Sequence, residues 1–271
     1  MHLNFFEFLH LGNQQGLVHT NPFVRIFFRL FGPLGIHARI RNGRVINALL
    51  KLSLASKRIL DCGSGHGYTL FYLARKYPAA NFKGVEIDKD QVTECIDITS
   101  KLGINNLRFE QSAVQELPRK PLYDLIYSID VLEHVENDRQ IVNNMVRSLI
   151  PGGYLVIHVP LRHQLQTRIF KSFEQHTVSD HVRDEYLPEE IIGIVQSADC
   201  NIINFQYGFG FWGELAFELN NLFWENRALR NISALLFFPI SLVCGYIDNQ
   251  MEYTRGNSIL VTAQKVNAIQ R

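Results

Sequence analysis

Residues 58–67 read RILDCGSGHG, and this stretch decides the fold of the chain. A short apolar run ends at Asp61, glycines occupy alternate positions from Gly63 to Gly67, and the helix-like segment YTLFYLARKY follows. A strand, a glycine turn and a helix in this order form a βα unit, in which glycines let the backbone approach a ligand closely. The start of the helix offers unpaired N–H groups to a ligand. The stretch therefore predicts a ligand site at the first βα junction of an α/β domain.

The spacing of the glycines separates two kinds of cofactor. A dinucleotide-binding turn reads G-x-G-x-x-G and holds a pyrophosphate at the helix start. Here the pattern is D-x-G-x-G-x-G, and Asp61 stands where its charge would repel a pyrophosphate. An acid at this position suits a cationic ligand instead, such as an ammonium group near a sulfonium. A tight βα turn without a ligand is the structural alternative.

A second acid follows at the distance that a ribose ligand requires. Residues 81–87, NFKGVEI, read as the next buried strand, and Glu86 lies 19 residues after Gly67. An acid about 20 residues beyond the glycine turn receives the ribose hydroxyls in nucleotide-binding βαβ units. A carboxylate accepts from two vicinal hydroxyls at once because it has two oxygens and no donor. Glu86 is therefore predicted to bind a ribose, with a solvated acid at a strand end as the alternative.

Four spaced segments carry a family resemblance: ILDCGSGHG, GVEID, YDLIYSIDVLEHV and LIPGGYLVIHVP. In this order they resemble the class I S-adenosylmethionine-dependent methyltransferases, in the small-molecule branch, over about residues 55–165. The resemblance implies a set of residues that bind the cofactor S-adenosylmethionine: Asp61, Gly63 and Gly65 around the methionine part, Glu86 on the ribose hydroxyls, and Ile87 against the adenine.

Two further positions follow from the resemblance. Asp130, after the fourth predicted strand, is expected close to the sulfonium and the acceptor. In the family an acid often follows the third strand and meets the adenine amino group, whereas this chain has Ser112 and Ala113 there. Ser112 or a backbone group is therefore expected to take the place of that acid.

The resemblance also implies the fold. We expect an α/β, Rossmann-like, seven-stranded methyltransferase sheet that is mostly parallel, with an antiparallel last strand and helical additions. Strands are predicted over 58–62, 81–87, 105–111, 123–128, 154–159, 201–207 and 257–265. We expect an N-terminal helical cap over residues 1–55 and a methyltransferase domain over 56–271 with a helical insertion at about 208–256.

The insertion contains a long uncharged run, ISALLFFPISLVCGYI, over residues 232–247. A spanning helix needs about 20 apolar residues, and Pro239 interrupts this run. We therefore do not expect a transmembrane helix. Three alternatives remain open for this segment: a buried helix, a homodimer contact, or a surface that dips into lipid.

Composition indicates a globular enzyme and argues against several other classes of protein. Hydrophobic residues make up 46% of the 271 residues, charged residues 20%, and the net charge is +1, so no general attraction to nucleic acid is expected. The four cysteines are scattered, which argues against a bound metal and a disulfide framework. No signal-peptide pattern stands at the N-terminus. We expect a cytoplasmic location, with peripheral membrane contact through residues 210–250 as an alternative.

The catalytic residues are predicted in the segment after the fifth strand, FEQHTVSDHVRDEY, at residues 173–186. Ligands of open α/β sheets bind beyond the carboxyl ends of the strands, where this segment begins. Histidine suits the removal of a proton from a nucleophile because its ordinary pKa is about 6.5. His181, and after it His176, are therefore the candidate bases, and Arg183 is a candidate for binding a substrate carboxylate or phosphate. The alternative is a polar surface loop in which the histidines cap helices.

These observations predict methyl transfer to a small molecule. Oxygen is the preferred acceptor atom, because a histidine base helps a hydroxyl most, and the acceptor is expected to be lipophilic or glycosyl. The segment SIDVL at residues 128–132 lacks the Asn/Asp-Pro-Pro-aromatic pattern of enzymes that methylate nucleic-acid bases or glutamine amides. The alternatives are a nicotinamide-dependent oxidoreductase and a non-catalytic module with a cofactor fold that binds a partner or a membrane.

Overall fold

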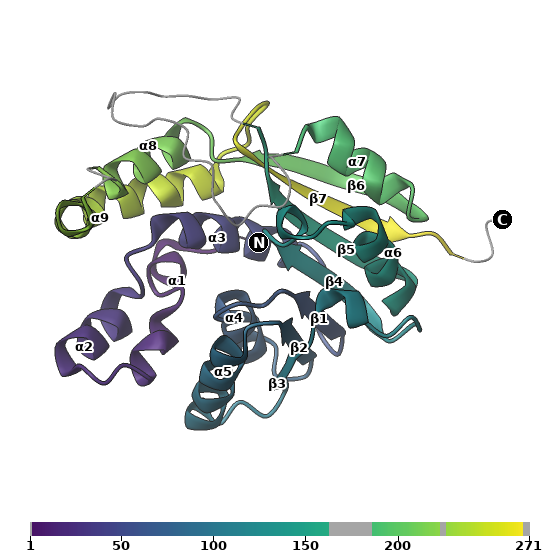
Figure 1. Cartoon of the computed structure of the whole chain (residues 1–271), viewed down its shortest axis with the longest axis horizontal. Helices are drawn as coiled ribbons and strands as arrows, with labels where there is room; N and C mark the ends of the chain where they lie inside the picture. The colour runs from purple at the N-terminus through teal and green to yellow at the C-terminus, as the bar shows by residue number, and fades with distance from the viewer. Residues whose placement is uncertain (1, 163–185, 223–225, 268–271) are drawn as a thin grey trace.

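A seven-stranded sheet in the order β3-β2-β1-β4-β5-β7-β6 forms the centre of the computed structural model, which describes residues 2–162, 186–222 and 226–267 (Figure 1). Its strands are β1 (Arg58–Cys62), β2 (Asn81–Glu86), β3 (Leu107–Gln111), β4 (Tyr123–Ile129), β5 (Leu149–Pro160), β6 (Cys200–Gly208) and β7 (Ser258–Lys265). Neighbouring strands from β3 to β5 pair in parallel, and β7 pairs antiparallel with both β5 and β6. The predicted Rossmann-like sheet with an antiparallel last strand is confirmed.

Helices cover both faces of the sheet, as the alternation of strand and helix patterns predicted. They are α4 (Tyr68–Lys76), α5 (Lys89–Leu102), α6 (Asp138–Ser148) and α7 (Pro188–Gln196). One buried core joins α4 and α5 to Ile59 and Phe82, and a second joins α6 and α7 to Leu60 and Ile126. Adjacent strand residues such as Ile59 and Leu60 thus belong to opposite cores, because successive side chains of a strand point to opposite faces.

Strand β5 begins earlier than the sequence suggested. Pro151, Gly152 and Gly153 were expected to separate a helix from a strand at about residue 154, but they lie inside β5. Leu149 pairs with Tyr123, the register then shifts, and Gly152 has a φ of 75° that accommodates the irregularity. Proline is tolerated at such an irregular strand position because a backbone N–H, which proline lacks, is not needed there for a regular inter-strand hydrogen bond.

Helical additions lie beside the sheet, on the left of Figure 1. Before β1 stand α1 (Phe5–Leu9), the 3₁₀ helix η1 (Asn13–Leu17), α2 (Pro22–Phe31) and α3 (Ile36–Leu49); between β6 and β7 stand α8 (Phe211–Asn220) and α9 (Arg227–Gln250). Two short 3₁₀ helices, η2 (Val114–Glu116) and η3 (Leu132–His134), follow β3 and β4. The division into a cap over 1–55 and a domain over 56–271 stays a prediction.

A buried ion pair fixes α9 against α3 and α8. The carboxylate of Asp248 lies 3.2 Å from the Arg44 guanidinium and accepts the backbone N–H groups of Gly210 and Gly213 at 3.0 Å. Asn231–Gln250 is long and apolar enough to cross a membrane by length and composition, and 44% of that window is buried in the fold. One side of α9 therefore belongs to the core of the chain.

Candidate cofactor and acceptor site

The glycine turn between β1 and α4 is closely packed on two sides and open at its middle. Gly63, Gly65 and Gly67 all have positive φ, at 78°, 51° and 68°. A Cβ at Gly63 would collide with Val131, whereas the nearest atom to a Cβ at Gly65 would be Gln91 Oε1 at 3.4 Å. Gly63 is thus required by packing and Gly65 by backbone conformation alone. Gly65 is the predicted cofactor contact at which a ligand has room to approach the turn.

The Glu86 carboxylate, at the end of β2, holds the glycine turn in place. One oxygen accepts the Gly65 N–H at 2.9 Å, and the other accepts the N–H groups of Ile87 at 2.8 Å and Asp88 at 3.1 Å. A carboxylate has about four lone-pair sites, so three are engaged in this structure. Binding of both ribose hydroxyls therefore requires Glu86 to release at least one backbone bond.

Asp61 carries the clearest sign of a cationic ligand. Its carboxyl is buried at the end of β1, and its Oδ1 has no hydrogen-bond partner among the described residues. Burial raises the pKa of Asp61 to about 8, the Glu86 charge adds to this rise, and the nearby Tyr127 hydroxyl opposes it only in part. A buried, unpartnered carboxyl is unfavourable. A ligand ammonium or sulfonium would supply the missing positive charge, so the residues present fit S-adenosylmethionine.

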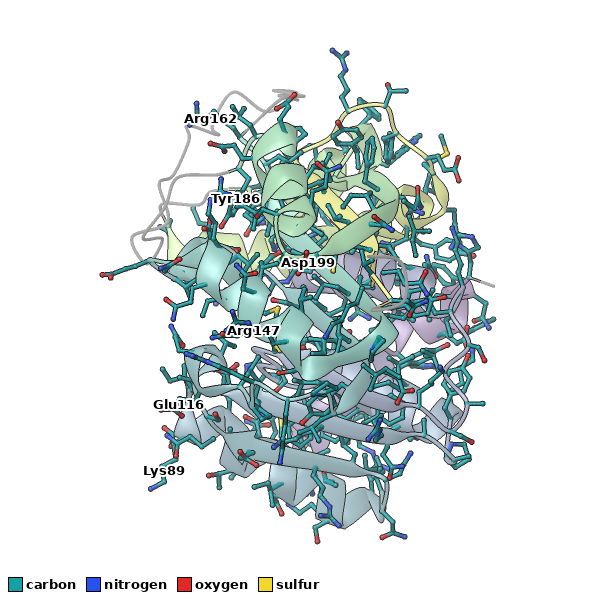
Figure 2. All side chains as sticks on the ribbon, turned by 90° about the vertical axis from the view of Figure 1, so that its right-hand side faces the viewer. Lys89, Glu116, Arg147, Arg162, Tyr186 and Asp199 are labelled. Atoms are coloured by element: carbon teal, nitrogen blue, oxygen red, sulfur yellow. The ribbon has the colours of Figure 1, made fainter. Side chains whose placement is uncertain are left out.

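The predicted adenine contacts lie beyond β2 and β3. The Ile87 side chain is 69% exposed, so an apolar surface is available there. The Ser112 hydroxyl donates to the Ala113 carbonyl at 3.3 Å and to the Glu116 carboxylate at 3.4 Å. Glu116, labelled in Figure 2, thus brings an acid beside Ser112, although the sequence pattern showed no acid directly after β3. Glu116 lies in the 3₁₀ helix η2, four positions after Ser112, so this acid reaches Ser112 from a later position than the family pattern places it.

Asp130 forms a charged cluster with residues that lie far from it in the sequence. Its carboxylate lies 2.5 Å from His158 Nδ1 on β5 and 2.5 Å from the Arg41 guanidinium on α3. Burial alone would raise the pKa of Asp130, but the positive charges of His158 and Arg41 outweigh it and lower the pKa. Asp130 therefore stays ionised. Arg41 and His158 were not predicted as partners of Asp130, because no local pattern joins positions 41, 130 and 158.

Glu133, in η3, is a second carboxyl group whose ionisation differs from that of Asp130. It is buried, and its Oε2 has no hydrogen-bond partner among the described residues. Burial raises the pKa of Glu133 to about 9, and the negative charge of Asp130 adds to that rise. Two carboxyl groups close together in a buried place thus differ in ionisation, since only Asp130 has cationic partners. Glu133 is protonated at neutral pH and can donate a hydrogen bond.

His37, at the start of α3, is the exposed member of this cluster. Its ring lies 4.7 Å from the ring of Phe209 and 5.5 Å from that of Phe217. The side chain is open to solvent, yet desolvation by the surrounding protein, together with the Arg41 charge, lowers its pKa. His37 is therefore neutral at physiological pH, and its lowered pKa makes it a weaker proton acceptor than an ordinary histidine.

The N-terminal helices pack over the glycine turn. The Gln15 side chain, in η1, donates to the His66 carbonyl at 3.1 Å. On α3, the Asn42 side chain accepts the Thr69 hydroxyl at 2.8 Å, next to the turn. These contacts place α3, with His37 and Arg41, between the cofactor side of the sheet and the helical additions.

The predicted catalytic residues His181, His176 and Arg183 lie outside the described residues. The positions that flank this segment are described. The backbone of Arg162 donates to the Tyr186 carbonyl at 3.0 Å, and Leu161 pairs with Tyr186 (Figure 2). The buried Tyr186 hydroxyl donates to the Asp138 carboxylate at 2.9 Å. Both flanks of the segment thus meet at the carboxyl end of β5.

Two methyltransferases from other organisms each match a little under half of the chain. A ubiquinone biosynthesis O-methyltransferase from Rickettsia typhi is 29% identical over 131 residues, which is 46% of this chain and 52% of that protein. A trans-aconitate 2-methyltransferase from Methylobacterium nodulans is 28% identical over 121 residues, 44% of this chain and 45% of that protein. The chain spans about half the length of the relatives it matches.

A solved structure shares the fold over nearly the whole chain. The phosphoethanolamine N-methyltransferase 2 of Haemonchus contortus, in complex with S-adenosyl-L-methionine, has a TM-score of 0.61 and 17% identity. The match covers 98% of this chain and 60% of that chain. A methyltransferase domain model matches residues 54–200, from just before β1 to the start of β6. Because this match covers more than half of the sequence, the chain belongs to the family of methyltransferase domains, in class I.

Proposed function

We propose that this chain transfers the methyl group of S-adenosylmethionine to the hydroxyl oxygen of a small lipophilic or glycosyl acceptor. The observation that carries the proposal is the buried Asp61 carboxyl at the glycine turn, whose Oδ1 lacks a partner among the described residues. A cation would favour the ionised carboxylate and complete its environment, whereas the pyrophosphate of a nicotinamide cofactor offers it no positive charge. The family assignment also favours methyl transfer over the oxidoreductase alternative.

When bound, the cofactor supplies an activated methyl group, so the protein mainly aligns the reactants. Asp61 would hold the ammonium group and Glu86 the ribose. Asp130 lies at the carboxyl end of β4, where His158 and Arg41 fix its carboxylate. His37 and Arg41 lie on the same helix, one turn apart, and would face an acceptor on the α3 side of the sheet. An oxygen acceptor is supported by the name of the Rickettsia relative.

Methyl transfer itself is tested with S-adenosylmethionine that carries a labelled methyl group. The chain is incubated with the organic and aqueous fractions of a cell extract, and the labelled products are identified by mass spectrometry. We expect label in a single small molecule, as a methyl ether formed at a hydroxyl oxygen. Cofactor binding without label in any fraction would contradict the proposal and favour the non-catalytic alternative.

Replacing Glu86 by alanine should weaken cofactor binding by about 1.5–3 kcal/mol, because a charge-assisted hydrogen-bonding group is lost. Calorimetric titration measures this change. The matched control is Glu110→Ala, which removes an acid of the neighbouring strand β3 that pairs with Lys83 at the surface. Equal affinities for the Glu86 variant and the wild type would reject the ribose role.

Two histidines compete for the role of general base. His181 follows β5 in the sequence, and His37 is the exposed, neutral imidazole of the described site. Replacing the base by alanine should slow turnover by about 100-fold or more, with cofactor affinity intact. His10→Ala, at an exposed position after α1, is the control. A loss confined to one variant identifies the base, and full activity in both would contradict a histidine base.

A further inference from the structure

Helix α9 exposes an apolar stripe to solvent on the side opposite the core. Its buried side contributes Phe238, Leu242 and Cys244 to the core. Between residues 232 and 243 its exposed large side chains are apolar, and Leu236 is 69% exposed; the stripe consists of Ile232, Leu235, Leu236, Ile240 and Val243. No residue from 231 to 247 carries a charge. A helix on the surface of a globular protein normally turns polar residues outward, so this stripe indicates a partner.

Helix α2, which contacts α9, presents a second apolar stripe. None of its residues is buried, and Phe23 is 83% exposed, followed at helical spacing by Ile26 and Leu30. The Phe27 ring lies 6.3 Å from the Phe238 ring of α9, so the two helices are in contact. We call the exposed apolar residues of both helices the α2–α9 face: Phe23, Ile26, Leu30, Ile232, Leu235, Leu236, Ile240 and Val243.

Positive charge without acids is concentrated in the part of the sequence that contains α2. Residues 8–60 contain no acid, but they hold eight of the 27 basic side chains, so all 26 acids lie elsewhere. On α2 itself, Arg25 and Arg29 are exposed. The chain as a whole has a net charge of only +1. An amphipathic helix with apolar residues on one side and arginines on the other is typical of helices that lie in a membrane interface.

We propose that the α2–α9 face docks on the surface of a lipid bilayer that contains anionic phospholipids. The arginines of α2 would meet the negative headgroups, and the apolar stripes would enter the boundary between headgroups and acyl chains. A symmetric pair of this chain through the same face would leave Arg25 and Arg29 without acidic partners, because neither α2 nor residues 231–247 contain an acid. Because Asp248 pairs with Arg44 in the core, α9 lies on the bilayer and does not cross it. The proposal does not depend on the methyl acceptor.

The test is sedimentation of the full chain with vesicles. We expect binding to vesicles of phosphatidylcholine mixed with phosphatidylglycerol, and weaker binding to phosphatidylcholine alone. Phe23→Ser and Leu236→Ser, each alone and combined, should reduce binding to the mixed vesicles at least about tenfold, because each removes apolar area that the bilayer would bury. Arg25→Gln with Arg29→Gln should reduce it about 25-fold, roughly fivefold for each arginine.

The matched control is Ile203→Ser with Phe205→Ser, which removes two exposed apolar side chains from the edge strand β6. This variant should bind vesicles as the wild type does. Thermal unfolding shows whether each variant is folded. If the combined variant is unfolded, Phe23→Ser alone is used for the binding comparison. The proposal is overturned if the wild type does not sediment with the mixed vesicles, or if the β6 variant loses as much binding. It is also overturned if ultracentrifugation shows a dimer that Leu236→Ser dissociates, without vesicle binding.

Discussion

Replacing Asp130 by asparagine is expected to lower the free energy of unfolding by about 3–5 kcal/mol at neutral pH. Among the described residues, Asp130 is the acid that forms ion pairs with both Arg41 and His158, and the substitution leaves those groups without this partner. Asparagine also tolerates the positive φ of 50° at this position, so backbone strain does not add to the effect. Urea unfolding at several pH values measures the loss.

The pH dependence of this effect has a definite sign. The pKa of Asp130 is lowered in the folded chain, so its contribution is fully present above the ordinary aspartate pKa of about 3.8 and is lost as the pH falls below that value. The free energies of unfolding of the variant and the wild type should therefore approach each other in strong acid. Asp124→Asn is the control: this acid lies on β4, before Asp130, and pairs with the more exposed Lys57 and Arg58, so its loss should cost at most about 1 kcal/mol. Equal losses of stability in Asp124→Asn and Asp130→Asn would contradict a stabilising role for the buried cluster of Asp130, Arg41 and His158.

Replacing Asp61 by asparagine is expected to weaken the binding of S-adenosylmethionine and to stabilise the free protein. Loss of the charge should reduce affinity by about 1.5–3 kcal/mol, or roughly 10- to 150-fold. The same change removes a carboxyl whose ionised form is disfavoured by burial, so the free protein gains stability. Calorimetry measures the affinity, and thermal unfolding without cofactor measures the stability. A variant that loses both affinity and stability would contradict this account of Asp61.

The stabilisation should grow with pH. Burial raises the pKa of Asp61 from 3.8 to about 8, so the wild type loses stability as the pH rises from about 4 to about 8, and the loss then levels off. Asparagine does not titrate, so the advantage of the variant should follow the same course. Asp97→Asn, at an exposed position paired with Lys101, is the control and should show no such dependence. Binding of the cation should also release a proton from Asp61 near neutral pH.

The sheet was predictable because its signals are local. The apolar run of β1, the glycine turn and the acid at the end of β2 each lie within a few residues, and their order along the chain indicates the topology. The start of β5 was predicted too late, because proline and glycine normally end an element. Here the register shift after Leu149 and the positive φ of Gly152 accommodate them within the strand.

The acceptor side of the site was less predictable. Arg41, Asp130 and His158 meet only through the packing of α3 against the ends of β4 and β5, and no spacing in the sequence indicates such a contact. His37 lies in the segment that was predicted as an N-terminal helical cap, and its i, i+4 relation to Arg41 was visible in the sequence. The roles of His176, His181 and Arg183 stay predictions, since these residues lie outside the described part of the chain.

Calorimetric titration of the chain with S-adenosylmethionine, alongside a reduced nicotinamide dinucleotide, tests the central claim most directly. We predict that one molecule of S-adenosylmethionine binds per chain, that Asp61→Asn and Glu86→Ala weaken this binding, and that the dinucleotide does not bind. Tight binding of the dinucleotide without binding of S-adenosylmethionine would contradict the account.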